Sequence, residues 1–325
     1  MRTIVTGGAG FIGSHLIEAL LARADDVLCL ERRGAPREWL AEAAIEWSPV
    51  GLDDPEMLKK TLRGADVVFH LAALAQARTA GEYYSVNTEG TARVFEAAAA
   101  QETPPRVILA SSLAAVGPCP DGELLSRHTV PHPISHYGVS KLLAESIAHA
   151  YFERVPTTVL RLATVYGPRE RAVLKMFQLV RRGVAITVGP WERQVSLVYA
   201  KDVVGTLIAT ATAPKTVGQT YCLGHPEPVR WMDFALEVGR VLGRRPVLVS
   251  IPTALAWAIA RISEIWAGFR RTAAILNWER VRELSQERWV CDSAAVIEDS
   301  GYRPQYPLSR GVRETVEWYQ EVGWL

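Results

Sequence analysis

The stretch that decides the fold is Thr3-Ile4-Val5-Thr6-Gly7-Gly8-Ala9-Gly10-Phe11-Ile12-Gly13. Residues with strand propensity run into three glycines spaced three apart, and an apolar helical pattern follows over residues 11–23. Gly7 permits a tight turn, Gly10 lets the backbone approach a pyrophosphate, and Gly13 lets the helix pack closely on the strand. The N-terminus of that helix then faces the anion. This segment predicts a dinucleotide-binding strand–turn–helix unit.

An acidic residue stands where such a unit would meet the adenosine ribose. Glu31 follows the next expected strand, 24 residues after Gly7. A carboxylate at this place accepts hydrogen bonds from a ribose diol and repels a 2′-phosphate, so the sequence favours NAD. Arg32 and Arg33 come directly after it, and guanidinium groups attract a 2′-phosphate, which keeps NADP as the alternative.

Short apolar runs alternate with helical patterns through the first half of the chain. The pattern predicts strands at residues 3–6, 27–30, 67–71, 107–110 and 158–162, and helices at residues 11–23, 55–62, 83–101 and 137–152. Strands and helices in alternation are typical of an α/β fold with a doubly wound parallel sheet, the Rossmann arrangement.

The composition of the sequence changes after about residue 165, where prolines shorten the expected helices and strands and tryptophans become frequent. We expect a smaller, discontinuous C-terminal lobe that binds the substrate, made of residues 166–194 and 223–325. Residues 1–165 form the dinucleotide-binding domain. Two segments that look like strands, 195–198 and 219–223, are expected to return to its sheet, so that residues 195–222 belong with it.

Composition excludes several classes of partner. The 36 Lys and Arg residues nearly balance the 35 Asp and Glu residues, which leaves a formal charge of +1 and no field for nucleic acid. The four cysteines lie 90, 103 and 69 residues apart, so a reducing, cytoplasmic compartment is expected. No apolar signal core precedes the first strand, and the most apolar stretch, residues 251–269, carries Arg261 and Glu264. These charges argue against a transmembrane span.

A second group of residues has the composition of an alcohol-oxidising site. Tyr137 and Lys141 lie four apart at the start of an expected helix and therefore share a face. Ser111 and Ser112 end the expected strand 107–110, at the sheet edge where ligands bind. Because a phenol with a pKa of about 10 is a weak base near neutral pH, we expect the Lys141 ammonium to lower the pKa of Tyr137. Ser112 would hold the substrate oxygen as charge develops on it.

These motifs together resemble the extended short-chain dehydrogenases/reductases, also called the NAD-dependent epimerase/dehydratase family. The likeness rests on the following segments: the glycine turn, His70-Leu71-Ala72-Ala73, Asn87-Thr88-Glu89-Gly90-Thr91, Ser111-Ser112, Tyr137-x3-Lys141, Leu160-Arg161, Val165-Tyr166-Gly167-Pro168, Asp202-Val203-Val204 and the closing helix 312–324. It covers nearly the whole chain.

The resemblance implies roles for individual residues. Ser112 would be the catalytic serine, with Ser111 in reserve, Tyr137 the acid/base, and Lys141 an additional contact to the nicotinamide ribose. The expected cofactor contacts are Gly7, Gly10, Phe11, Ile12, Gly13, Glu31, Arg32, Leu52, Leu71, Ala72, Ala73, Asn87 and Lys141. The family also implies a homodimer formed through the helices near residues 84–101 and 137–152.

The chain departs from the sugar-nucleotide members of that family. Many relatives carry Gly-Asp in the loop that meets adenine, whereas Val50-Gly51-Leu52-Asp53-Asp54 has no clean equivalent, and Leu52 is expected to pack on the adenine. Where those members usually have an asparagine, an arginine and an Arg-x-x-Asp clamp, this chain has Thr164, Val195 and Arg282-Glu283-Leu284-Ser285. Losing groups that would bind a diphosphate argues against a nucleotide sugar.

Residues 251–269 suggest what the second lobe binds. The segment predicts a helix with a broad apolar face, which forms core, lines a pocket for an apolar substrate, or meets a lipid surface. This resembles the branch of 3β-hydroxysteroid dehydrogenase-like enzymes. Candidate substrate contacts are His136, Thr164, Tyr166, Arg193 and Arg282. His128, His132 and His136 recur every fourth residue, but Pro131 and Pro133 interrupt any helix between them, so no metal site is expected.

Three hypotheses follow. The first is an NAD(P)-dependent oxidoreductase that interconverts a secondary alcohol and a ketone on a bulky, largely apolar small-molecule substrate. The second is an epimerase or dehydratase of a sugar nucleotide, in which bound NAD returns the hydride to the product. The third is a cofactor-sensing protein without turnover, against which Ser112, Tyr137 and Lys141 argue.

Overall fold

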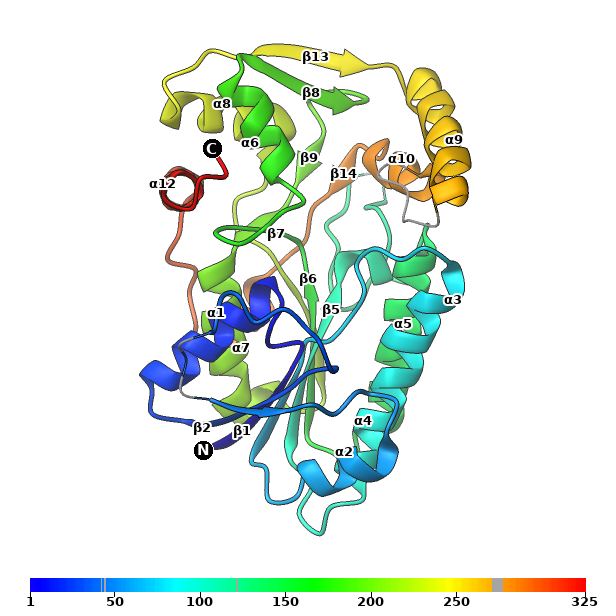
Figure 1. The fold of residues 1–325 in the computed structure, drawn as a ribbon, viewed down its shortest axis with the longest axis vertical. Coiled ribbons are helices and arrows are strands. Elements are labelled where there is room, and N and C mark those ends of the chain that lie inside the picture. The colour runs from blue at the N-terminus through cyan, green and yellow to red at the C-terminus, as the bar shows by residue number, and fades with distance from the viewer. Residues whose placement is uncertain (42, 44, 121, 271–276) are drawn as a thin grey trace.

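A seven-stranded parallel sheet forms the larger part of the molecule (Figure 1). The structure is a computed structural model that describes residues 1–41, 43, 45–120, 122–270 and 277–325. The sheet order is β11-β6-β5-β4-β1-β2-β3. The strands are β1 (Arg2–Thr6), β2 (Asp26–Leu30), β3 (Glu46–Ser48), β4 (Val67–His70), β5 (Arg106–Ser112), β6 (Thr157–Leu162) and β11 (Gln219–Leu223). The predicted α/β fold with a doubly wound sheet is confirmed.

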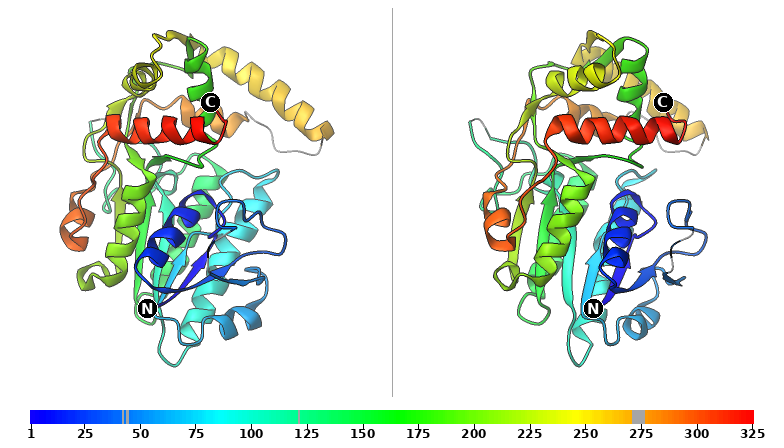
Figure 2. Two further views of the ribbon diagram at one scale, coloured as in Figure 1. Left: turned by 60° about the vertical axis from the view of Figure 1, so that its left-hand side comes forward. Right: turned by 90° about the vertical axis from the view of Figure 1, so that its left-hand side faces the viewer.

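Helices cover both faces of this sheet (Figures 1 and 2). On one face lie α1 (Phe11–Ala22) and α7 (Ala200–Thr212), and on the other α2 (Pro55–Thr61), α4 (Gly90–Ala99) and α5 (His136–Ala150). Neighbouring residues of one strand therefore enter different cores: Val5 packs with Leu16 of α1, and Ile4 packs with Phe95 of α4. Burial on both faces explains why the strands are almost continuously apolar.

The expected helix at residues 83–101 is a composite of three elements. It consists of α3 (Ala80–Tyr83), the π-helical turn η1 (Tyr84–Glu89) and α4. A π-helical turn inside a helix often marks a functional site, and η1 carries Asn87. The π-helical turn lacks a distinct hydrophobic period, so the sequence pattern did not reveal it.

A smaller lobe lies over the carboxyl ends of the large sheet's strands (Figure 1). It contains three small sheets: β7 (Thr164–Tyr166) with β10 (Leu197–Tyr199); β9 (Gln194–Val195) with β12 (Val229–Arg230) and β14 (Arg288–Trp289); and β8 (Val184–Val188) with β13 (Val247–Ile251). Its helices are α6 (Leu174–Arg181), α8 (Trp231–Val241), α9 (Thr253–Arg270), α10 (Trp278–Leu284) and α12 (Leu308–Glu321). The remaining elements are α11 (Ala294–Ser300), η2 (Leu113–Ala115) and η3 (Pro214–Thr216).

The two segments expected to return to the large sheet behave differently. Residues 219–223 form β11 beside β6, at the sheet's edge. Residues 195–198 fall in β9 and β10, which pair with β14, β12 and β7 outside the large sheet. They are short strands, and their partners come from three separate segments, β7, β12 and β14, that local pattern does not link.

The apolar stretch from residue 251 is also divided. Ile251 ends β13, where it pairs with Val188, and the helix α9 begins at Thr253. Among the described helices, none combines the length with the apolar character that crossing a bilayer demands.

Candidate functional site

The glycine turn between β1 and α1 is built by backbone contacts that exclude side chains. Gly7 has φ +74°, and a Cβ there would lie 2.7 Å from the Ala72 nitrogen. A Cβ on Gly13 would meet the Gly7 carbonyl oxygen. Gly10 is the N-cap of α1 and has no side chain to satisfy the first N–H groups of the helix, which include those of Phe11 and Ile12. The end of α1 is therefore suited to an anion.

The structure places Glu31 against this turn. Its Oε1 accepts a hydrogen bond from the Ala9 N–H at 2.9 Å. Burial raises the pKa of the carboxyl group, and the bond from Ala9 opposes that rise. Arg32 and Arg33 are both exposed to solvent, so the acid and not the guanidinium groups borders the glycine turn.

The loop after β4 lies directly beside the glycine turn. Leu71 N donates to the Thr6 carbonyl (3.1 Å) and Ala72 N donates to Thr6 Oγ1 (3.2 Å), which holds the loop against β1. Ala73 follows and is exposed. These three residues are thus next to the glycine turn, where the resemblance predicted cofactor contacts.

Asn87 braces this loop against the helix that carries Tyr137. It is buried, its Oδ1 accepts from Leu74 N (2.7 Å), and its Nδ2 donates to the Leu74 carbonyl (3.0 Å) and to Ser140 Oγ (3.0 Å). Ser140 Oγ in turn donates to the Tyr137 carbonyl (2.7 Å). In this arrangement Asn87 links the loop after β4 to α5, the helix that carries Tyr137.

Leu52 lies where the adenine is expected. It is partly buried and packs so closely on Gly90 that a Cβ there would lie 2.8 Å from its Cδ1. The neighbouring Asp54 is the N-cap of α2 and accepts from Met57 N at 3.0 Å. The carboxylate of Asp54 therefore has a structural role in this loop.

The two serines at the end of β5 point in opposite directions, as alternation along a strand requires. Ser111 is buried and donates to Glu145 Oε1 at 2.5 Å. Ser112 caps η2 by accepting from Ala114 N (3.1 Å) and lies close enough to Tyr137 to lower the pKa of its phenol. The structure thus brings Ser112, and not Ser111, to the phenol.

Tyr137 lies in the first turn of α5, which is capped by Ser135. The expectation that its pKa is lowered was wrong for this structure, because burial raises it. The polar Ser112 side chain opposes the rise in the pKa, and the nearby Glu283 carboxylate adds to it. The phenol is therefore protonated near neutral pH.

Lys141 is buried one turn further along α5. Its Nζ donates to the Ala110 carbonyl at 2.6 Å. Burial lowers the pKa of the ammonium group to about 8, while Glu145 opposes that change. A cation that is bonded to a carbonyl and partly neutral near pH 8 stabilises the phenolate less than the sequence argument assumed.

His70 is a buried residue of the site to which the sequence had given no role. Its Nδ1 meets Thr6 Oγ1 at 2.8 Å and its Nε2 meets Thr91 Oγ1 at 2.9 Å. Burial, followed by the charge of Lys141, lowers the pKa of the imidazole to about 3. Neutral His70 therefore joins β1, β4 and α4 directly beneath the cofactor loops.

The candidate substrate contacts are scattered. Thr164 and Arg282 are exposed, and exposed His136 bonds Tyr84 through Nδ1 at 2.8 Å. Arg193 is buried, and its Nη1 donates to the carbonyls of Val188 (3.2 Å) and Leu284 (2.5 Å).

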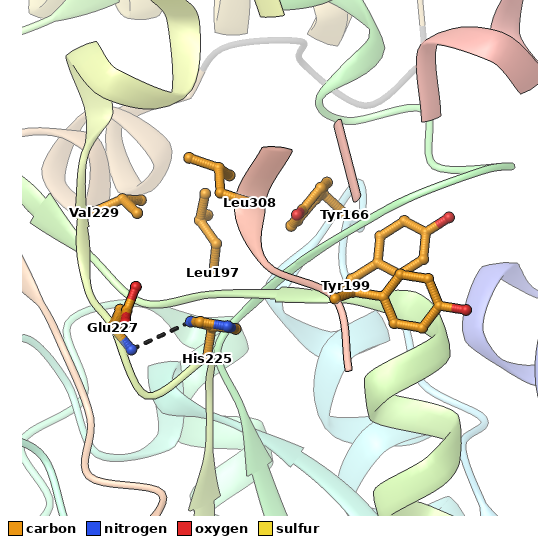
Figure 3. Close-up of a pocket in the computed structure, with 8 residues that line it drawn as sticks. Tyr166, Leu197, Tyr199, His225, Glu227, Val229 and Leu308 are labelled. Atoms are coloured by element: carbon orange, nitrogen blue, oxygen red, sulfur yellow. Dashed lines mark hydrogen bonds between the residues drawn. The ribbon is translucent and has the colours of Figure 1, made fainter. Parts of the chain in front are cut away.

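Tyr166 lies in the aromatic core of the smaller lobe. It is 2% exposed and packs edge-on against Tyr199 and Phe234. Tyr166 and Tyr199 border a cavity of about 10 Å³, shown in Figure 3. This space is about the size of one water molecule and is too small for a substrate.

The three histidines that precede Tyr137 each form hydrogen bonds with a different partner. His136 bonds Tyr84, His132 N donates to the Val116 carbonyl (2.6 Å), and His128 Nε2 accepts from Arg127 (3.2 Å). Within the described part of the chain, no cluster of three metal-ligating side chains occurs.

Comparison with protein families gives one match over most of the chain. Residues 3–224 match the model described as the NAD dependent epimerase/dehydratase family. These residues include the glycine turn, Ser112, Tyr137 and Lys141.

Individual relatives act on different substrates. Ceramide reductase of Caulobacter vibrioides is 27% identical over 99% of this chain and 95% of its own length. A 3beta-hydroxysteroid-dehydrogenase/decarboxylase, isoform 2, of Arabidopsis thaliana is 26% identical over 98% of this chain, which spans 62% of that protein. A solved structure of MoeE5 in complex with UDP-glucose and NAD has a TM-score of 0.78, 26% identity, and 99% coverage of both chains.

Proposed function

Because the chain belongs to the NAD-dependent epimerase/dehydratase family, we propose that it is an NAD-dependent oxidoreductase that interconverts a secondary alcohol and a ketone. The proposed substrate has a bulky, largely apolar skeleton. The observation that carries the proposal is that Ser112 lies beside Tyr137 at the carboxyl edge of the sheet and opposes the rise in the pKa of the phenol. This is the place where ligands bind in doubly wound sheets.

The residues around the glycine turn fit NAD. Gly7 and Gly13 pack without Cβ atoms, and the side-chain-free N-terminus of α1 suits a pyrophosphate. Glu31, held by Ala9, suits a ribose diol and disfavours a 2′-phosphate. Bound NAD supplies hydride chemistry: its oxidised form takes a hydride from an alcohol carbon, and its reduced form returns one to a ketone carbon.

The chain's own residues handle the proton. In the reducing direction Tyr137 donates its phenolic proton to the ketone oxygen, so that the carbonyl becomes a hydroxyl group. In the oxidising direction the phenolate accepts the hydroxyl proton while the carbon loses its hydride. Ser112 positions the same oxygen by a hydrogen bond in both directions. The raised pKa of Tyr137 keeps the phenol protonated near neutral pH, which is the form that donates a proton in the reducing direction.

Three positions support an apolar substrate over a nucleotide sugar. Val195 is buried in the apolar core of the smaller lobe. Arg193 uses Nη1 on backbone carbonyls, and Arg282 faces solvent. A substrate diphosphate requires guanidinium groups directed toward it, which neither arginine provides in this arrangement.

The alternative is a sugar-nucleotide epimerase or dehydratase that keeps NAD bound. The similarity to MoeE5, solved with UDP-glucose and NAD, favours this second function. It uses the same tyrosine and cofactor but returns the hydride to the product.

One experiment separates the two functions. The purified protein is incubated with NAD and a panel of hydroxysteroids, long-chain hydroxyacyl compounds and UDP- or dTDP-sugars, and absorbance of NADH is recorded while products are analysed by mass spectrometry. Net NADH formation with an apolar alcohol supports the oxidoreductase. Conversion of a nucleotide sugar without net NADH contradicts it and establishes the alternative.

We also propose a homodimer through α4 and α5, as the family resemblance implies. The two helices are adjacent, and Leu143 on α5 is 41% exposed. Light scattering of the protein should give twice the mass of the chain, and Leu143→Glu should reduce it to that of one chain.

A reducing, cytoplasmic location is proposed from the cysteines. All four are free thiols, and Cys29, Cys222 and Cys291 are buried. Fractionation of cells that produce the protein is the direct test.

A further inference from the structure

Two carboxylates from a distant segment accept hydrogen bonds at the N-terminus of α5, the helix that carries Tyr137. His136 N donates to Glu279 Oε1 at 2.6 Å, and Ser135 Oγ donates to Glu283 Oε1 at 2.7 Å. Both glutamates belong to α10 in the smaller lobe, more than 140 residues further along the chain. Figure 1 shows α10 between α9 and the upper end of α5.

These bonds are made by the two residues that directly precede Tyr137. The first N–H groups of a helix have no partner within the helix. Ser135 Oγ satisfies Gly138 N at 3.1 Å, and Glu279 satisfies His136 N. A carboxylate at this place is also favoured by the helix dipole. The turn that presents the phenol is therefore held through α10.

Hydrogen bonds to other parts of the smaller lobe hold both ends of α10 in place. Trp278 N at its start donates to Glu264 Oε1 of α9 at 2.9 Å. The Leu284 carbonyl at its end accepts from Arg193 Nη1 at 2.5 Å. A displacement of the smaller lobe would consequently move Glu279 and Glu283.

We infer that α10 is a positioning element that couples the smaller lobe to Tyr137, with Glu279 and Glu283 as its positioning residues. The inference rests on the role of Tyr137 proposed above. Occupation of the smaller lobe by a substrate would thus set the orientation of the phenol, although neither glutamate reacts.

The charged residues of α10 also couple this helix to Tyr137 electrostatically, because they change the pKa of its phenol. From α10, Glu283 raises and Arg280 lowers the pKa of the phenol. The other polar groups near it are Tyr83 of α3, Ser112 of β5 and Lys141 of α5. Loss of the Glu283 charge should therefore make the phenol more acidic.

Hydrogen exchange of the full-length protein, read by mass spectrometry on peptides that cover residues 136–139, tests the coupling without any substrate. Glu279→Ala should accelerate exchange there about fivefold, the size expected from losing a helix cap. Glu279→Gln keeps an acceptor oxygen and should restore most of the protection. Glu287→Gln, which changes an exposed glutamate just after α10, is the matched control and should leave exchange unchanged.

A variant in α9 distinguishes coupling from a local cap. Glu264→Ala should accelerate exchange at residues 136–139 in the natural background and add nothing in the Glu279→Ala background. Unchanged exchange in the Glu264→Ala protein would overturn the inference, as would unchanged exchange in Glu279→Ala.

Turnover gives the functional readout. Glu283→Gln should shift the alkaline limb of the kcat/KM profile to lower pH, and Glu279→Ala should lower kcat more than it changes KM. If Tyr137→Phe retains full activity, the proposed function fails, while the exchange data still decide whether α10 holds α5. If exchange responds as expected but the pH profile and kcat do not, the inference is wrong as a statement about Tyr137.

Discussion

The carboxylate of Glu31 accepts a hydrogen bond from the Ala9 N–H at 2.9 Å, which joins the end of β2 to the glycine turn. This contact fixes the acid beside the glycine turn, next to the position proposed for the adenosine ribose. Glu31→Ala removes the acceptor and exposes the site to the neighbouring Arg32. We expect NAD to bind about tenfold more weakly, with NADP binding gained relative to NAD, because charge-assisted hydrogen bonds are lost.

Calorimetric titration with each dinucleotide measures that ratio. Glu38→Ala, an exposed change in the same loop, serves as the control. An unchanged ratio in Glu31→Ala would show that the carboxylate does not select the cofactor.

Replacing Tyr137 with Phe should remove the acid/base and little else. We expect turnover to fall by about 10²- to 10⁴-fold, the usual contribution of general acid–base catalysis, with NAD affinity retained. Tyr83→Phe is the matched control, because its ring is buried, lies 6.0 Å from that of Tyr137 and is subject to the same charged residues of α10. Steady-state kinetics and thermal melting of both variants are the measurements. Full activity in Tyr137→Phe would remove the basis of the mechanism.

His70 should make the protein sensitive to acid. The folded state keeps the imidazole neutral, with a pKa of about 3, whereas an unfolded chain binds a proton below about pH 6.5. Acidification therefore favours the unfolded state, and stability is lost as the pH falls from about 6.5 toward 3. His70→Gln, which does not titrate, should reduce the slope of unfolding free energy by up to about 1.4 kcal/mol per pH unit.

Urea unfolding at several pH values tests this prediction. His132→Gln, a change at an exposed histidine, should leave the slope as it is. Equal slopes in the natural protein and in His70→Gln would show that His70 is not the group responsible.

Breaking the buried ion pair of Arg161 and Glu145 should destabilise the protein, because one charged group is left buried without its partner. The two side chains meet at 2.8 Å with 5% and 0% exposure, and Ser111 donates a further hydrogen bond to the carboxylate. Arg161→Met should lower the free energy of unfolding by about 3–5 kcal/mol, because it leaves Glu145 buried without its cation. Adding Glu145→Met should recover much of the loss.

Chemical denaturation of the single and double variants provides the comparison. Arg78→Met breaks an exposed pair with Glu82 and should change stability little. A double variant no more stable than the single one would mean that the lost packing, and not the unpaired charge, sets the cost.

Local sequence pattern predicted the parts of the molecule that depend on neighbours in the chain. The glycine turn can be read from spacing because Gly7 and Gly13 are required by contacts that leave no room for a Cβ. Six of the seven strands of the large sheet were found because burial on both faces makes them largely apolar. The short edge strand β3 (Glu46–Ser48) was not predicted, because it is at most partly buried and carries no apolar run. Tyr137 and Lys141 were identified because a spacing of four places them on one helix face.

The sequence by itself determined the fold class, the nucleotide-binding turn and the candidate catalytic residues. Only the tertiary structure decided the environment of those residues: the raised pKa of Tyr137, the neutral His70 between Thr6 and Thr91, and the docking of Glu279 and Glu283 on α5. Spacing along a helix or strand follows from backbone geometry, whereas burial and charge at a site depend on segments that the chain brings together from more than 140 residues apart.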